Sequence, residues 1–118
     1  MVHFSTVSLL KPFFMQLKTA VYNIAWMRDL FEKDGSPITT GKQEIRSKQL
    51  AEIIEALNPD FLGIVEGPDT LVNGSRTATR QLEFWVSHFL PSHSFKAIHG
   101  FPSAGQQELC AIYKPDKI

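Results

Sequence analysis

Two segments of the chain place apolar residues at helical spacing. In the first, the apolar positions follow i, i+3, i+4 and i+7, and they are Leu50, Ile53, Ile54 and Leu57. Charged residues occupy the other face, so the pattern predicts an amphipathic helix over residues 42–57. Asn58-Pro59 ends it, because a proline disfavours the helical conformation of the residue before it. The second segment repeats apolar residues from Ala78 to Phe89, which predicts a helix over about residues 77–90.

Four short segments have the composition of strands. Residues 18–23 are rich in β-favouring side chains and end at the polar Asn23. Residues 61–65 are apolar without alternation, which is typical of a strand buried on both faces, and Glu66 follows at its carboxyl end. Residues 95–99 and 108–113 are two further strand candidates. The predicted order is strand, helix, strand, helix, strand, strand, so the fold class is α/β (α+β) with one sheet and two helices.

The remaining segments show neither the periodicity of a helix nor that of a strand. The turn residues Asp34-Gly35-Ser36-Pro37 predict a surface loop over residues 27–41. Residues 1–17 contain two short apolar runs separated by Lys11-Pro12, which leaves no continuous core for a signal peptide. We therefore expect residues 1–17 to be a loosely ordered N-terminal extension and residues 18–118 to form one domain.

Composition narrows the class of protein. Hydrophobic residues make up 43% and charged residues 20% of the chain, which is ordinary for a globular protein. Twelve basic residues balance twelve acidic ones, so nucleic acid is permitted as a substrate but is not indicated by charge. The single cysteine, Cys110, lies in an apolar run, which favours a buried structural thiol. No segment approaches the ~20 apolar residues of a membrane span, so we expect a cytoplasmic protein with no membrane partner.

Two polar residues stand where predicted strands end. If the strands are neighbours, the amide oxygen of Asn23 and the carboxylate of Glu66 meet at one edge of the sheet. Such an oxygen-only pair suits Mg²⁺ better than zinc or copper. The alternative is structural: Asn23 turns back to its own backbone, and Glu66 caps or forms a salt bridge locally.

Three segments resemble sequence motifs of one known protein family. They occur in the same order and at similar spacing as in that family. Residues 19–24 (Thr-Ala-Val-Tyr-Asn-Ile) resemble an opening strand that ends in Tyr-Asn, and residues 46–66 resemble the next helix and strand, where Asn-Pro-Asp leads to an apolar strand and a glutamate. Residues 108–115 resemble a later strand that closes on a basic residue. The family is the endonuclease/exonuclease/phosphatase family of metal-dependent phosphoesterases. The resemblance implies part of a two-sheet α/β sandwich, with Asn23 as the first metal-site residue, Glu66 as the metal-ligating carboxylate and Mg²⁺, or alternatively Mn²⁺, as the cofactor.

The chain departs from the family pattern at several points. Val65 stands where many members have glutamine, and Ala25 stands where some nucleases of the family have aspartate. The family's Asp-x-Asn pair and closing Asp-His motif, which lie in its second half, are absent from this sequence. The histidines His88, His93 and His99 do not match the catalytic histidine, and we expect them to have no catalytic role.

The resemblance thus implies a truncated or split phosphoesterase that contributes the first metal-site residues. The alternatives are a noncatalytic interaction remnant and a gene fragment without function. The substrate would be a phosphate ester of unknown type, since the family acts on DNA, RNA, inositol phosphates and sphingomyelin. A complementing C-terminal half or a second copy of the chain is the expected protein partner.

Aromatic residues offer a further hypothesis. Trp26, three residues after Asn23, is the ring that we expect near a substrate, and Phe84 is expected to be exposed. Trp85 and Phe89 lie on the apolar face of the second helix and are predicted to be core residues. Phe13-Phe14 is a candidate partner-binding patch.

Overall fold

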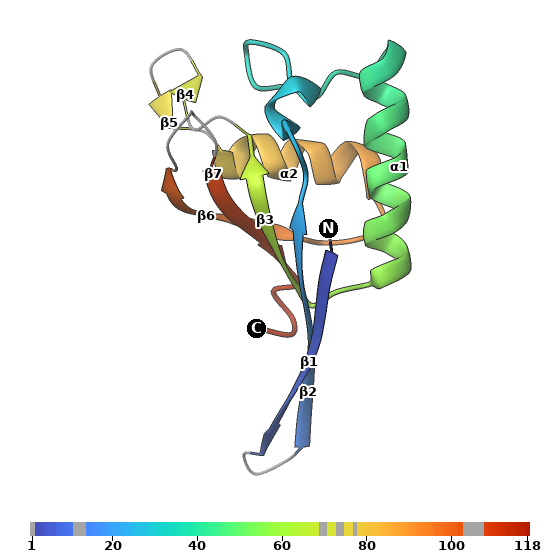
Figure 1. Ribbon diagram of the computed structural model, residues 1–118, viewed down its shortest axis with the longest axis vertical. Coiled ribbons are helices and arrows are strands. Elements are labelled where there is room, and N and C mark those ends of the chain that lie inside the picture. The colour runs from blue at the N-terminus through green and yellow to red at the C-terminus, as the bar shows by residue number, and fades with distance from the viewer. Residues whose placement is uncertain (1, 11–13, 69–70, 73–74, 77, 103–107) are drawn as a thin grey trace.

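The architecture is defined by a computed structural model, which describes residues 2–10, 14–68, 71–72, 75–76, 78–102 and 108–118 (Figure 1). Phe13 lies outside these residues, as does the side chain of Phe14. In chain order, the described elements are β1 (Val2–Leu10), β2 (Phe14–Asn23), the 3-10 helix η1 (Met27–Leu30), α1 (Gly41–Leu57), β3 (Phe61–Gly67), β4 (Leu71–Val72), β5 (Ser75–Arg76), α2 (Ala78–Phe89), β6 (Lys96–Pro102) and β7 (Glu108–Tyr113).

A five-stranded sheet forms the centre of the molecule, in the order β1-β2-β3-β7-β6. Strands β2 and β3 are parallel, and the other neighbours are antiparallel. A parallel pair requires a crossover connection, which η1 and α1 provide. Strands β4 and β5 form a separate two-stranded sheet. The predicted mixed class, with one main sheet and two α-helices, is confirmed.

The two α-helices contribute to one hydrophobic core on one face of the sheet. Leu62 and Ile64 of β3 are buried, whereas the residues that alternate with them are only half-buried. The same core contains Leu50, Ala51 and Ile54 from α1 and Leu82, Trp85 and Val86 from α2. Strand β3 is therefore buried fully on one face, and the prediction of burial on both faces is wrong. Its apolar run without alternation reflects a partly open second face that is also apolar.

Helix α1 ends where the sequence predicts. Asn58 adopts a left-handed conformation with φ 46°, and its N–H donates to Ile54 O at 2.8 Å. Asparagine tolerates this conformation better than most residues, and Pro59 cannot continue the helix. Cys110 is buried, as predicted. None of the helices in the described part of the chain is long and apolar enough to cross a membrane.

The N-terminal segment differs from the prediction. Residues 2–10, expected to be a loosely ordered extension, form β1 and pair with β2 from Val2↔Tyr22 to Leu10↔Phe14. Strand β2 consequently begins at Phe14, four residues before the predicted start. The two strands project together away from the helices (Figure 1). Residues 2–5 alternate apolar and polar side chains, as in a strand, but the alternation shifts at Thr6 and the Lys11-Pro12 break separates the two strands.

The segment after β2 also differs from the prediction. Residues 27–41 were expected to be a surface loop, yet Met27, Leu30 and Phe31 are buried in the core. They are carried by η1 and the residue after it. The predicted turn is present further on, where Gly35 has φ 91° and Ser36 donates its N–H to Asp34 Oδ1 at 2.9 Å. Strands β4 and β5 were not predicted, because two-residue strands carry no periodicity.

Candidate functional site

Asn23 and Glu66 lie at the carboxyl ends of neighbouring parallel strands. Asn23 pairs with Val65 in the register of β2 and β3, and Ile24 N–H donates to Val65 O at 3.1 Å. Glu66 is the next residue along β3. Asn23 is exposed and Glu66 is half-buried. The prediction that the two strands are adjacent is confirmed, and both residues come to the same edge of the sheet.

Glu66 lies in an irregular part of its strand. The register between β3 and β7 shifts between Ile64 and Gly67, and Glu66 has a positive φ of 60°. A bulge of this kind bends a strand and redirects the side chain that it contains. The carboxylate points back across the end of β2, where Glu66 Oε2 accepts a hydrogen bond from Trp26 N–H at 3.2 Å. Glu66 therefore uses one of its two oxygens in a contact with a residue 40 positions away, which is neither the local cap nor the local salt bridge of the structural alternative.

The turn after β2 is held by α1 as well. Arg46 Nη1 donates to Trp26 O at 3.4 Å, and Arg46 Nη2 donates to Ala25 O. Trp26 has φ 54°, its side chain is 48% exposed, and the Arg28 guanidinium lies 5.0 Å from the centre of its ring. Trp26 is thus an exposed residue whose backbone N–H contacts Glu66, one of the two candidate metal residues.

The donor set at this edge is small. Within the residues that the structure describes, no group of three or more His, Cys, Asp or Glu side chains is gathered. Asn23 and Glu66 offer one amide oxygen and one carboxylate, which is the oxygen chemistry that Mg²⁺ prefers. Magnesium commonly keeps several waters and binds through one or two carboxylates, so this pair fits a weak magnesium site and does not fit a closed protein cage.

His88, His93 and His99 lie on other parts of the structure. His88 is an exposed residue of α2, with its ring centre 4.6 Å from that of Phe89. His93 Nε2 lies 3.7 Å from Glu55 Oε1 and its ring stacks on Phe95. His99 is exposed on β6. In the described part of the chain, none of these residues contacts Glu66 or Asn23 through a hydrogen bond or an ion pair.

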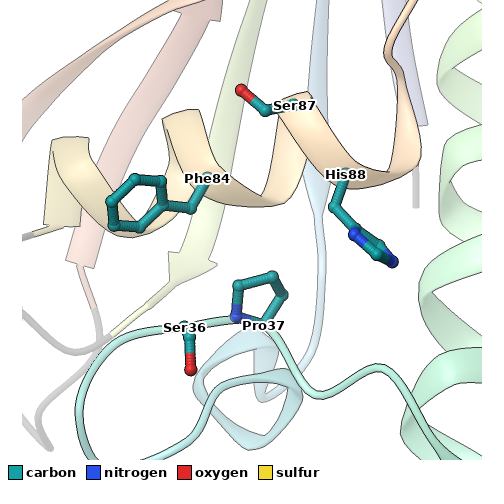
Figure 2. A pocket seen from close by; sticks show the side chains of 5 residues that line it. All are labelled: Ser36, Pro37, Phe84, Ser87 and His88. Carbon is teal, nitrogen blue, oxygen red and sulfur yellow. The ribbon is translucent and has the colours of Figure 1, made fainter.

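A separate hollow lies between α2 and the loop before α1 (Figure 2). It has a volume of about 400 Å³ and is lined by Ser36, Pro37, Phe84, Ser87 and His88. Phe84 is 45% exposed, whereas Trp85 is 1% exposed and Phe89 packs against the core, as predicted for all three rings. Neither Asn23 nor Glu66 lines this hollow.

Sequence reasoning missed the part played by Arg46 and by the Trp26 backbone. A lone arginine on a helix face and a main-chain N–H carry no motif, so only the folded arrangement brings Arg46 to the Ala25–Trp26 turn and Trp26 N–H to Glu66. Comparison with protein-family models, with curated proteins and with solved structures finds no match.

Proposed function

We propose that the sheet edge at Asn23 and Glu66 is the metal-binding part of a Mg²⁺-dependent phosphoesterase site of the endonuclease/exonuclease/phosphatase type. The observation that carries this proposal is the parallel pairing of β2 and β3, which brings an amide and a carboxylate to one edge. Ligands of open α/β sheets bind outside the carboxyl ends of parallel strands. The two residues that carry the family resemblance therefore lie where a ligand of such a sheet binds, and their side chains supply oxygen donors.

Each residue has a distinct part in this site. Glu66 supplies the negative charge, which provides most of the attraction for a divalent cation, and Asn23 supplies a neutral amide oxygen. Trp26 offers an apolar ring face beside them for part of the substrate. When bound, Mg²⁺ would polarise the phosphate ester and stabilise the leaving oxygen. No residue of this sequence matches the family's water-activating histidine, so we assign the chain metal and phosphate binding and expect little hydrolysis.

The proposal is tested with the purified chain and a simple phosphodiester. Mg²⁺ or Mn²⁺ should perturb the NMR signals of residues around Asn23 and Glu66, and hydrolysis of bis-p-nitrophenyl phosphate should stay near background. Metal-induced shifts that are absent, or that centre on another part of the sheet, would remove the basis for the metal site. Metal-dependent hydrolysis that Glu66→Gln abolishes would instead make the chain an enzyme complete in itself.

A second candidate function, noncatalytic interaction, is favoured by the open face of the sheet. Ile98, Ala111, Gly63 and Val21 form one row across β6, β7, β3 and β2. Ile98 and Val21 at the ends of this row are 45% and 43% exposed, and Leu109 on the same face is 44% exposed. A hollow of about 200 Å³ lies among Ile98, Leu109 and Phe61. Ala111 within the row is 4% exposed and Gly63 has no side chain, so the exposed apolar residues lie toward the two ends of the row. Ile98 and Leu109, which border the hollow, are the candidate surface for another protein chain.

A further inference from the structure

The backbone of Trp26 is held at both of its polar groups. Its N–H donates to Glu66 Oε2 at 3.2 Å, and its carbonyl accepts from Arg46 Nη1 at 3.4 Å and from Asp29 N–H at 3.0 Å. Arg46 also donates to the carbonyl of Ala25. Arginine presents several N–H groups in a rigid planar fork, so one side chain fixes two successive peptide groups. A residue of α1 is thereby connected to the carboxylate of β3 through the turn after β2.

This connection coincides with unfavourable backbone conformations. Trp26 has φ 54° and Glu66 has φ 60°. A left-handed conformation brings the Cβ of an L-residue close to its own carbonyl oxygen, and bulky residues rarely adopt it. Such conformations persist where surrounding contacts determine them, and they concentrate at functional sites. At Trp26 the surrounding contacts are those of Arg46 and Glu66, together with the backbone hydrogen bond from Asp29 N–H.

We propose that Arg46 is a positioning residue, which fixes the Ala25–Trp26 turn so that Trp26 N–H orients the Glu66 carboxylate. The inference rests on the proposed function for the role of Glu66 in metal binding. A carboxylate with Oε2 engaged by an N–H presents its other oxygen to a cation, so Glu66 binds Mg²⁺ through one oxygen. Without Arg46 the carbonyl of Ala25 loses this side-chain donor and the carbonyl of Trp26 keeps only Asp29 N–H, so the N–H that orients the carboxylate is held less firmly.

The positive charge of Arg46 and its positioning role predict opposite effects on metal binding, which makes the inference testable. A guanidinium near the site repels a cation, so its removal strengthens Mg²⁺ binding if charge is all that matters. If Arg46 acts by positioning, its removal weakens binding. Arg46→Lys retains the charge but lacks the fork, so it behaves like Arg46→Gln only under the positioning model.

The experiment compares Arg46→Lys and Arg46→Gln with the wild type, using the full chain and Mg²⁺ or Mn²⁺ alone. Shifts induced by Mg²⁺ and line broadening induced by Mn²⁺ give the affinity. We expect affinity to fall about 10-fold or more in both variants, as for other residues that orient metal ligands. Lys48→Gln is the matched control, because Lys48 lies on the same helix and contacts Glu44 at 3.7 Å, away from the turn. Tighter binding in Arg46→Gln, or wild-type affinity in Arg46→Lys, would overturn the inference.

A metal-free measurement separates this inference from the proposed function. Hydrogen exchange of the Trp26 amide should be slow in the wild type and should approach the rate of Glu66→Ala, which lacks the acceptor, in both Arg46 variants. Wild-type protein that binds no Mn²⁺ would end the metal-site proposal, and the amide measurement alone would then decide the positioning role. An unchanged Trp26 exchange rate in folded Arg46→Lys would contradict that role. Should Arg46→Gln fail to fold, Arg46→Lys gives the deciding result.

Discussion

Trp85 donates its indole N–H to Ser47 Oγ at 3.0 Å, and the two residues are 1% and 0% exposed. Trp85 lies on α2 and Ser47 lies on α1, so this buried hydrogen bond connects the two helices that share the core. An indole N–H can only donate, and a buried one requires an acceptor. This hydrogen bond explains why a polar residue, Ser47, occupies the apolar face of α1.

Ser47→Ala should therefore destabilise the fold. The substitution leaves the Trp85 N–H buried without an acceptor, which costs about 1–3 kcal/mol. Urea denaturation followed by circular dichroism measures the change. Ser87→Ala on the exposed side of α2 is the control and should leave the free energy of unfolding nearly unchanged. Equal stabilities of the two variants would show that the Ser47 hydroxyl does not contribute.

Metal binding should respond differently to the two residues at the sheet edge. Glu66→Gln keeps the shape of the side chain but removes its charge, and it should abolish detectable Mg²⁺ binding. Asn23→Ala removes a neutral ligand and should weaken binding less. Titration with Mg²⁺ followed by NMR provides the measurement, with Glu52→Gln on the exposed face of α1 as the control. An Asn23 variant that loses more affinity than the Glu66 variant would contradict the assigned parts.

The loop before α1 should show a pH response at Asp34. The Ser36 hydroxyl donates to Asp34 Oδ1 at 2.6 Å and the Ser36 N–H donates at 2.9 Å, and these bonds hold the pKa of Asp34 below its ordinary value. A lowered pKa in the folded state means that the stabilisation is present above the unfolded pKa and is lost as the pH falls through the folded pKa. Ser36→Ala should raise the pKa of Asp34 toward its ordinary value, as measured by NMR titration of the carboxyl carbon. Thr39→Ala, which removes a nearby exposed hydroxyl, should not change it.

The open sheet face should promote association of the chain. Leu109→Lys and Ile98→Lys place charge on this face and should reduce self-association, because charged side chains oppose burial between two copies. Sedimentation velocity over a range of concentrations tests this. Ile45→Lys is the control, since Ile45 is 58% exposed on α1. A wild-type chain that stays monomeric throughout and melts sharply would refute the interaction role of this face.

The sequence predicted best where periodicity and residue chemistry agree. The apolar spacing from Leu50 to Leu57 and the Asn58-Pro59 stop gave α1 to within one residue, and β7 has the predicted bounds. The predicted chain order also placed Asn23 and Glu66 at strand ends that are now seen to be adjacent. These features depend on local sequence, which is why a single chain reveals them.

Features that depend on contacts between distant residues were not predicted. Met27 and Leu30 lie in a stretch without a sustained period, and their burial comes from the crossover that folds η1 against the core. The hydrogen bonds of Trp26 join it to Arg46, which is 20 positions away in the chain, and to Glu66, which is 40 positions away. Strand β1 was missed for another reason, since its alternation shifts at Thr6 and the Lys11-Pro12 break separates it from its partner β2.

The central place of β3 also sets an order for the assembly of the sheet. Its parallel partner β2 precedes it in the chain, but its other partner, β7, follows it by about forty residues. Leu62 and Ile64 meet Ile112 and Cys110 only after that stretch has been synthesised. A nascent chain that stops before β7 exposes one edge of β3 to pairing with other chains. Pairing with β7 thus covers the edge of β3 that the nascent chain exposes.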